Sequence, residues 1–209
     1  MEINKIYCME ALEFLKEFPD NYADLILTDP PYGIGEEKGK GSGIGKIERR
    51  TYEDKWDGKT PKKEIFNEII RVGKKVIIFG GNFFTDKLPV GTQWIVWDKV
   101  GNQRQFKDFG DCELAWTNIG KKIIKKYFVM QKGFIAEEKA RLHPTQKPVA
   151  LIMNILEDYT IPGQIIMDPF IGSGTTAVAA KKLGRNFIGC DILQKYVDIS
   201  NKRLESQWI

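Results

Sequence analysis

Hydrophobic and polar positions along this chain follow two periods, one typical of buried strands and one typical of amphipathic helices. Short apolar runs recur, and segments with an apolar residue every three to four positions lie between them. This alternation predicts an α/β fold with a mainly parallel, seven-stranded Rossmann-like sheet and helices on both faces. The expected strands are 3–7, 24–28, 75–79, 94–97, 112–116, 165–167 and 186–190, and the expected helices are 10–17, 61–73, 148–159, 175–183 and 194–206.

One long segment fits neither period. Residues 33–59 are rich in glycine and charged side chains. A loop of this length inside a compact domain is uncommon unless it is functional or mobile. We therefore expect a mobile substrate loop near 33–59, with a tolerated surface insertion as the alternative. The rest of the pattern predicts a single domain over residues 1–209.

Composition narrows the class of protein mainly by exclusion. No apolar run approaches the ~20 residues that span a bilayer, and the first residues lack a signal-peptide pattern. Cys8, Cys112 and Cys190 are dispersed, which fits a reducing cytoplasm. With one histidine and no Cys/His cluster, we expect no metal site. Because no long apolar run is present, we also expect no membrane partner.

The net charge of +4 is modest, but the basic residues are unevenly distributed. A solvated face is the favoured interpretation of the basic stretch between Ile119 and Lys147, and a phosphate-contacting face is the alternative. Only Glu137 and Glu138 oppose the positive charges there. The basic residues are Lys121, Lys122, Lys125, Lys126, Lys132, Lys139, Arg141 and Lys147.

Candidate chemistry begins where the strand over 24–28 ends, at Asp29-Pro30-Pro31-Tyr32. A carboxylate, two rigid prolines and an aromatic ring at the end of a buried strand can hold a planar ring that carries an amino group. The loops at the carboxyl ends of strands are also where α/β proteins place their sites. This tetrapeptide is therefore a candidate acceptor site.

A second candidate site follows the strand over 165–167. Asp168 ends that strand, and Gly172 and Gly174 let the backbone approach a ligand closely before the next helix. Asp191 ends the following strand, where a carboxylate commonly binds ribose hydroxyls, although a helix N-cap is an equal alternative. Because no lysine follows the glycines, the segment is not a phosphate-binding P-loop. A ligand with an adenosine but no phosphate fits better.

Three segments together resemble the amino-group DNA methyltransferases, specifically the beta class, in which the catalytic motif precedes the cofactor motif. Asp29–Tyr32 matches the catalytic motif, Asp168–Thr176 matches the cofactor motif, and His143–Pro148 matches a His-Pro-Thr-x-Lys-Pro segment just upstream. The resemblance covers nearly the whole chain. It implies a circularly permuted motif order in which the terminal helix ends near the first strand.

The resemblance implies methyl transfer from S-adenosylmethionine to adenine N6 of a base flipped out of double-stranded DNA. Asp29 and the Pro30 carbonyl would accept the two N–H groups of the amine. Tyr32 would stack on the base, so Tyr32→Phe is expected to be tolerated. Glu10 would lie near the cofactor adenine, and Thr145 and Lys147 near its methionine end. The full implied cofactor set is Glu10, Asp29, Thr145, Lys147, Asp168, Phe170, Gly172, Ser173, Gly174, Thr175 and Asp191; Phe170 has plain core packing as an equal alternative.

Three alternatives stay open: a cytosine-N4 DNA methyltransferase, an RNA adenine-N6 methyltransferase and, least favoured, a non-catalytic nucleic-acid-binding homologue. The region that reads sequence in this family would be small here, near 100–142. Gln103, Arg104 and Gln105 are candidate base-edge readers, with a polar hairpin tip as the alternative. A short or relaxed target site, or help from a second copy in a homodimer, is therefore expected. The setting implied is restriction-modification in a bacterial cell or phage-infected host.

Overall fold

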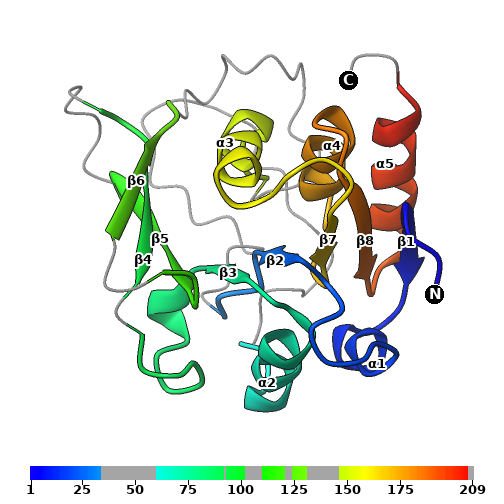
Figure 1. The fold of residues 1–209 in the computed structure, drawn as a ribbon, viewed down its shortest axis with the longest axis horizontal. Coiled ribbons are helices and arrows are strands. Elements are labelled where there is room, and N and C mark those ends of the chain that lie inside the picture. The colour runs from blue at the N-terminus through cyan, green and yellow to red at the C-terminus, as the bar shows by residue number, and fades with distance from the viewer. Residues whose placement is uncertain (34–59, 92, 102–109, 121–123, 131–145, 207–209) are drawn as a thin grey trace, which may run out of the picture.

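The computed structural model describes residues 1–33, 60–91, 93–101, 110–120, 124–130 and 146–206, which form a single mixed sheet with helices on both faces (Figure 1). Of the strands, β5 alone runs antiparallel to its neighbours. The predicted mainly parallel α/β fold is therefore confirmed. In spatial order the strands are β1 (Lys5–Cys8), β8 (Asn186–Asp191), β7 (Ile165–Asp168), β2 (Leu25–Thr28), β3 (Val76–Phe79), β5 (Cys112–Thr117), β4 (Trp94–Asp98) and β6 (Ile124–Phe128).

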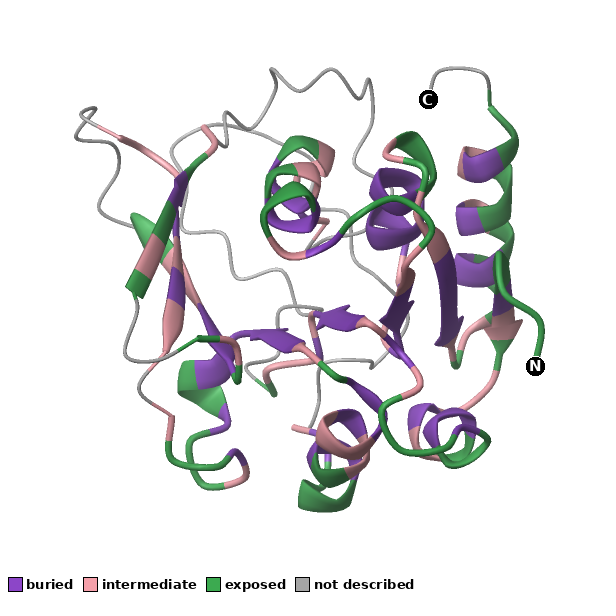
Figure 2. Cartoon of the chain, viewed as in Figure 1, coloured by how far each residue is buried: buried purple, intermediate pink, exposed green. Residues whose placement is uncertain are grey.

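The central strands are buried on both faces because helices cover each side. The helices α3 (Val149–Tyr159), α4 (Thr175–Lys182) and α5 (Gln194–Glu205) cover one face, and α1 (Ala11–Lys16) and α2 (Lys63–Val72) cover the other (Figure 1). Leu25 and Leu27 pack into the core of the first face, whereas Ile26 packs into the second. The buried sides of the helices face the sheet (Figure 2). Successive apolar residues in β2 thus serve two separate cores, as expected for a sheet covered on both faces.

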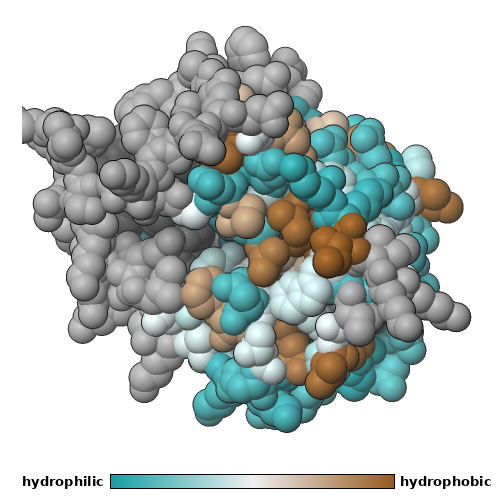
Figure 3. Space-filling view, turned by 90° about the vertical axis from the view of Figure 1, so that its left-hand side faces the viewer, coloured by the Kyte–Doolittle hydropathy of each residue, from teal (hydrophilic) through white to brown (hydrophobic). Residues whose placement is uncertain are grey.

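The sheet has eight strands, so the predicted number, seven, was one too low. The additional strand is β6, which pairs parallel with β4 at the edge. Ile124, Lys126 and Phe128 point to the exposed side of β6, while Tyr127 is buried. Figure 3 looks onto this edge, where hydrophobic and hydrophilic side chains lie next to one another. Two lysines within a five-residue strand masked its alternation in the sequence.

The start of α2 also differs from the prediction. The helix begins at Lys63 with Lys62 as its N-cap residue, whereas the sequence predicted a start at residue 61. The hydroxyl of Thr60 accepts a hydrogen bond from Lys87 Nζ and so joins two segments that are distant in the sequence.

The described part of the basic stretch is paired within the molecule. Lys125 contacts Asp158 at 2.6 Å, and Lys126 contacts Asp98 at 2.7 Å. Lys147 is buried, with 8% of its surface exposed. Lys147 therefore does not belong to the solvated face that the sequence favoured, whereas Lys126 is exposed and Lys125 is partly exposed. Lys121, Lys122, Lys132, Lys139 and Arg141 lie outside the described residues.

The first and last elements of the chain lie side by side, as the permuted order predicts. Strand β1 pairs parallel with β8, from Lys5 opposite Ile188 to Cys8 opposite Asp191. Helix α5 contacts β1 and runs beside it (Figure 1). The N-terminal strand therefore completes the part of the sheet that the C-terminal segment begins.

Several predictions fall outside the described residues. These are nearly all of the substrate loop near 33–59, most of the recognition region near 100–142, the candidate base readers Gln103, Arg104 and Gln105, and His143 and Thr145 of the upstream motif. Among the residues that are described, no helix is long and apolar enough to cross a membrane. No group of three or more His, Cys, Asp or Glu side chains in the same residues could hold a metal ion.

Candidate active site

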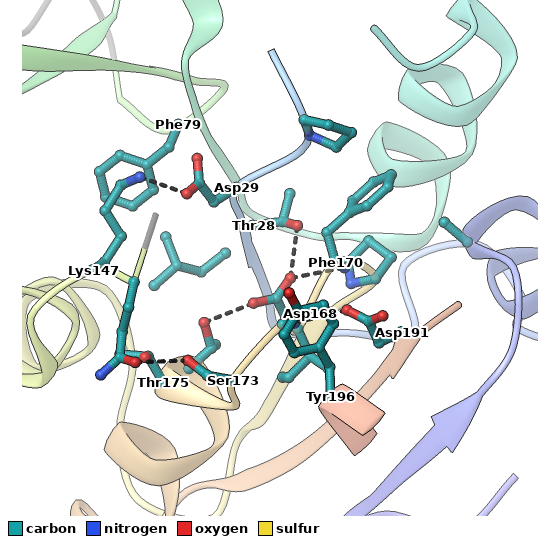
Figure 4. Close-up of a pocket in the computed structure, with 18 of the residues that line it drawn as sticks. Thr28, Asp29, Phe79, Lys147, Asp168, Phe170, Ser173, Thr175, Asp191 and Tyr196 are labelled. Atoms are coloured by element: carbon teal, nitrogen blue, oxygen red, sulfur yellow. Dashed lines mark hydrogen bonds and ion pairs between the residues drawn. The ribbon is translucent and has the colours of Figure 1, made fainter. Parts of the chain in front are cut away.

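A cavity of about 670 Å³ opens at the carboxyl ends of the central parallel strands. Asp29 follows β2, Asp168 ends β7 and Asp191 ends β8, and all three line the cavity (Figure 4). Parallel strands place their carboxyl ends at the same edge of a sheet, which explains how residues so distant in sequence meet. The volume lies in the range of pockets that enclose a small molecule or cofactor.

Asp168 is held by three neutral donors. Its Oδ1 accepts hydrogen bonds from the Thr28 hydroxyl at 2.7 Å and from the Phe170 backbone N–H at 3.0 Å, and its Oδ2 accepts one from the Thr176 hydroxyl at 2.8 Å (Figure 4). Burial raises the pKa of Asp168 to about 6, although these three donors oppose the shift. Thr28 is the residue just before Asp29, so this hydrogen bond directly connects the two predicted motifs.

The glycine turn after Asp168 is fixed from behind by α5. Gly174 has a φ of 83°, and a Cβ there would lie 2.7 Å from the Ser200 hydroxyl. That hydroxyl donates to the Gly172 carbonyl at 2.8 Å, and Arg203 donates to the Ser173 carbonyl at 2.6 Å. Glycine at position 174 is thus required both by the left-handed backbone and by the close approach of α5.

Asp191 and Glu10 lie at the far end of the cavity. Asp191 accepts the N–H of Leu193 at 2.8 Å and that of Gly172 at 3.2 Å, so it joins β8 to the glycine turn. Burial raises the pKa of Asp191, against the effect of these two N–H groups. Glu10 is the N-cap of α1 and accepts hydrogen bonds from the backbone of the first helical turn through Oε2. The predicted cofactor residues at this end therefore also have structural partners.

The acceptor end of the cavity has a different character because Asp29 pairs with a cation. Lys147 Nζ lies 2.5 Å from Asp29 Oδ2 (Figure 4). The Tyr32 hydroxyl donates to Asp29 Oδ1 at 2.5 Å. Burial raises the pKa of Asp29, although the ammonium and the hydroxyl oppose this. Burial alone would lower the pKa of Lys147, but the charge of Asp29 and its other anionic neighbours raises it well above its ordinary value.

A third carboxylate, from Glu113 on β5, reaches the same ammonium. Glu113 Oε2 lies 3.2 Å from Lys147 Nζ, and Glu113 Oε1 lies 3.2 Å from Lys99 Nζ. Burial would raise the pKa of Glu113, but the two lysine charges outweigh it and lower that pKa. A role for Glu113 in the site could not be predicted from the sequence. A glutamate in a strand that alternates polar and apolar residues is normally expected to be exposed.

Tyr32 is held by aromatic packing rather than free to rotate. Its ring stacks on that of Phe83 with centroids 4.8 Å apart and planes 15° apart, and Phe84 contacts it edge-on. A Cβ on Gly80 would lie 2.1 Å from the Tyr32 ring, and Gly80 has a φ of 68°. The turn after β3 therefore leaves room for this ring, and Phe83 is a further aromatic neighbour that the motif did not indicate.

Most of the predicted site residues meet around one cavity. Pro30 is buried beside Asp29, and Pro30, Tyr32 and Gly174 are not among the residues that line the cavity. Thr145 lies outside the described residues. Lys147, predicted near the methionine end of a cofactor, lines the cavity and bonds to Asp29 of the catalytic motif. The predicted residues that line the cavity are Glu10, Asp29, Pro31, Lys147, Asp168, Phe170, Gly172, Ser173, Thr175 and Asp191.

Comparison with known proteins agrees with this geometry. The family model described as DNA methylase (N6_N4_Mtase) matches residues 89–202, more than half of the 209 residues. The Type II methyltransferase M2.DpnII of Streptococcus pneumoniae is 29% identical over 95% of this chain and 88% of its own length.

Two solved structures share the fold. M1.HpyAVI in complex with SAM has a TM-score of 0.64 and 23% identity, covering 97% of this chain and 99% of that one. The cytosine-N4-specific PvuII DNA methyltransferase has a TM-score of 0.65 and 16% identity, covering 100% of this chain and 92% of that one.

The fold, the cavity and the family match together define the class: this chain belongs to the N6/N4 DNA methylase family. Its activity is S-adenosylmethionine-dependent methylation of an amino group in DNA.

Proposed function

We propose that this protein methylates N6 of adenine in a base extruded from duplex DNA. The observation that carries the proposal is the placement of Asp29, which follows β2 at one end of the cavity and is joined through Thr28 to Asp168 on the neighbouring strand β7. In this family an aspartate at the first position of the catalytic motif favours adenine, whereas cytosine-N4 enzymes more often carry serine there. The relatives that bear type II methyltransferase names support a role in restriction-modification.

The cofactor end of the cavity fits S-adenosylmethionine by shape and donor set. The cavity volume of about 670 Å³ suits a ligand of this size. Asp191 and Glu10 supply carboxylates at the end away from Asp29, where an adenosine would place its hydroxyl and amino groups. When bound, S-adenosylmethionine supplies a methyl group on a sulfonium, which is a good leaving group. The protein then needs mainly to align the acceptor.

Asp29 and Pro30 prepare the acceptor nitrogen. The lone pair of an exocyclic amine is delocalised into its ring, which makes the amine a poor nucleophile. We infer that Asp29 accepts one N–H and the Pro30 carbonyl the other, drawing the nitrogen toward tetrahedral geometry. Positive charge grows on the nitrogen as the C–N bond forms, and the buried carboxylate stabilises that charge. The nitrogen then loses one of its two original protons, for which Asp29 is the first acceptor.

Tyr32 supports the base itself. A base stacked inside a duplex cannot reach a buried cavity, so it must be extruded and held by other contacts. The Tyr32 ring, already fixed against Phe83, offers a rigid surface for stacking. A flipped base would thus exchange stacking in the duplex for stacking on the protein.

The deciding experiment identifies the modified nucleoside. Unmethylated genomic DNA, duplex and heat-denatured, and structured RNA are each treated with the protein and labelled S-adenosylmethionine, then digested and separated. N6-methyl-2′-deoxyadenosine from duplex DNA is the expected product. N4-methyl-2′-deoxycytidine, or label in RNA alone, would replace the proposal with one of the two alternative substrates.

Asp29→Ala is the matched variant. It is expected to lower transfer by about a thousandfold or more, because the group that stabilises the developing charge is lost. Binding of S-adenosylmethionine, followed by calorimetry, should persist because Asp168 and Asp191 are intact. Substantial residual methylation by this variant would contradict the assigned role. The proposed pairing of two copies is tested separately by the mass of the protein in solution, with and without DNA.

A further inference from the structure

The ammonium of Lys147 occupies the place at Asp29 where the proposed function requires a substrate amine. It donates to Asp29 Oδ2 at 2.5 Å and lies 3.4 Å from the Tyr32 hydroxyl. It also lies 5.8 Å from the Tyr32 ring centroid and 5.1 Å from that of Phe79. An N–H donor placed between a carboxylate and an aromatic ring is what a bound base would also supply. The side chain therefore competes with the substrate for Asp29.

This contact opposes catalysis as well as binding. A cation at 2.5 Å largely neutralises the Asp29 carboxylate, which is then less able to stabilise positive charge on the acceptor nitrogen. The same cation repels that charge directly. For Asp29 to act, the ammonium must move away while staying paired, because an unpaired buried charge is strongly unfavourable.

Glu113 provides the second position for the ammonium. Its Oε2 is buried and has no hydrogen-bond partner in the described part of the chain, although it lies only 3.2 Å from Lys147 Nζ. The ion pair at this distance only partly compensates a buried carboxylate oxygen, which is best stabilised by a full hydrogen bond. Rotation of the lysine side chain toward Glu113 would shorten this contact and lengthen the contact with Asp29.

We propose that Lys147 moves from Asp29 to Glu113 when the target amine binds, so that Glu113 is a positioning residue for the catalytic Asp29. This inference rests on the proposed methyl transfer. Glu113 touches neither substrate nor cofactor in this scheme. It acts by keeping the ammonium paired while Asp29 accepts the amine.

The charge state of the cluster supports the exchange. Burial opposes charge on all three groups, yet the pKa of Lys147 is raised by its anionic neighbours and that of Glu113 is lowered by its two lysine neighbours. Both groups are therefore charged at neutral pH, and the ammonium has an anionic partner in either position. Lys99 forms a separate ion pair with the other oxygen of Glu113.

The test compares Glu113→Gln with Lys99→Gln in single-turnover methylation of a duplex whose site has been mapped with the wild-type protein. Glu113→Gln keeps the shape but removes the negative charge. The single-turnover rate is expected to fall roughly 10- to 100-fold, which is less than the roughly 100- to 1000-fold loss typical of a group that contacts the reacting atoms directly. The dissociation constant of S-adenosylmethionine should stay within about twofold, since the cofactor end is untouched.

Lys99→Gln is the matched control, because it breaks the other ion pair of Glu113 and leaves the charge that Lys147 needs. Its rate should stay close to that of the wild type. An equal loss in both variants would mean that Glu113 only ties β4 to β5, which overturns the inference. A Glu113→Gln rate within about twofold of wild type would overturn it as well.

One further measurement supports the comparison of rates. Glu113→Asp retains the charge, so its rate should exceed that of Glu113→Gln; the reverse order would count against the exchange. Wild-type methylation with none of these effects rejects only the lysine exchange, while a wild-type protein that methylates no nucleic acid rejects the proposed function itself.

Discussion

Two carboxylates of the cavity, Asp168 and Asp29, are held by opposite kinds of partner. Asp168 is bound by two threonine hydroxyls and a backbone N–H, all neutral. Asp29 is bound by an ammonium that a second carboxylate shares. The first arrangement comes largely from one continuous turn, whereas the second brings together β2, β5 and the segment before α3.

The difference is between hydrogen bonds that persist when a ligand binds and an ion pair that can exchange its partners. Neutral donors that belong to the turn itself stay in place when a ligand enters, so the cofactor end is organised in advance. An ion pair assembled from separate segments can change partners while every charge stays compensated. The acceptor end therefore contains the part of the site that must rearrange during the reaction.

The largest expected effect is that of Gly174→Ala, which disturbs the glycine turn after Asp168. The left-handed backbone and the contact with Ser200 should together cost about 4 kcal/mol of unfolding free energy. Denaturant unfolding measures this loss, and calorimetry should show a parallel loss of cofactor affinity.

Gly163→Ala is the control for that substitution. Gly163 also has a positive φ, of 85°, but a Cβ there would meet nothing within 4 Å. We expect it to cost only about 1–2 kcal/mol, the conformational part alone. Equal losses in the two variants would show that the packing of α5 against the turn contributes nothing.

Asp168→Asn tests whether a carboxyl held only by neutral donors makes the unfolding free energy of the protein depend on pH. A folded-state pKa raised from 3.8 to about 6 means that the carboxyl favours the folded state most below pH 3.8, and that this contribution is lost as the pH rises through 6. The shift corresponds to roughly 3 kcal/mol at about 1.4 kcal/mol per pH unit. The unfolding free energy of wild type minus that of the variant should therefore fall between pH 4 and pH 6.5.

For Asp24→Asn, the unfolding free energy of wild type minus that of the variant is expected to rise with pH. Burial would raise the pKa of Asp24, but Lys74 and the N–H of Ile165 outweigh it and lower the pKa. Its contribution is present above the ordinary pKa of aspartate and is lost as the pH falls. Parallel slopes for the two variants would remove the distinction between a carboxyl held by neutral donors and one held by a cation.

Tyr32→Phe is the smallest expected effect, and it revises the sequence-based expectation that this change is tolerated. The Tyr32 hydroxyl donates to Asp29 Oδ1, so its loss should lower the transfer rate roughly tenfold, as for one hydrogen bond to a charged group. Tyr127→Phe removes a similar bond to Asp158, at 2.5 Å and away from the cavity, and should leave the rate unchanged. An unchanged rate for Tyr32→Phe would restore the simpler view that only the ring matters.

The central fold was predictable because its strands carry strong signals. Strand β2 is four apolar or β-branched residues followed by Asp29, and β7 ends in Asp168, so both strands and the carboxylates at their ends could be located. Strand β6 was missed because Lys125 and Lys126 made a paired edge strand look like a solvated basic segment. Tertiary pairing with Asp158 and Asp98, which the local sequence does not record, decides that case.

The site was predictable where its chemistry is contiguous in sequence and not where it is assembled across strands. The motifs located Asp29, Asp168 and the glycine turn. They could not show that Thr28 joins the motifs, that Lys147 turns toward Asp29, or that Glu113 shares its charge. Such contacts depend on strand order and on which face of β5 lies over the cavity.

The pairing of β1 with β8 also has a consequence for biosynthesis. Lys5 is synthesised long before its partner Ile188 on β8. Closing so long a loop is slow, because the entropy of the intervening chain is lost before the contact forms. The buried side of β1 thus stays without its neighbour until β8 has been made, and only then is the edge of the sheet beside β8 covered.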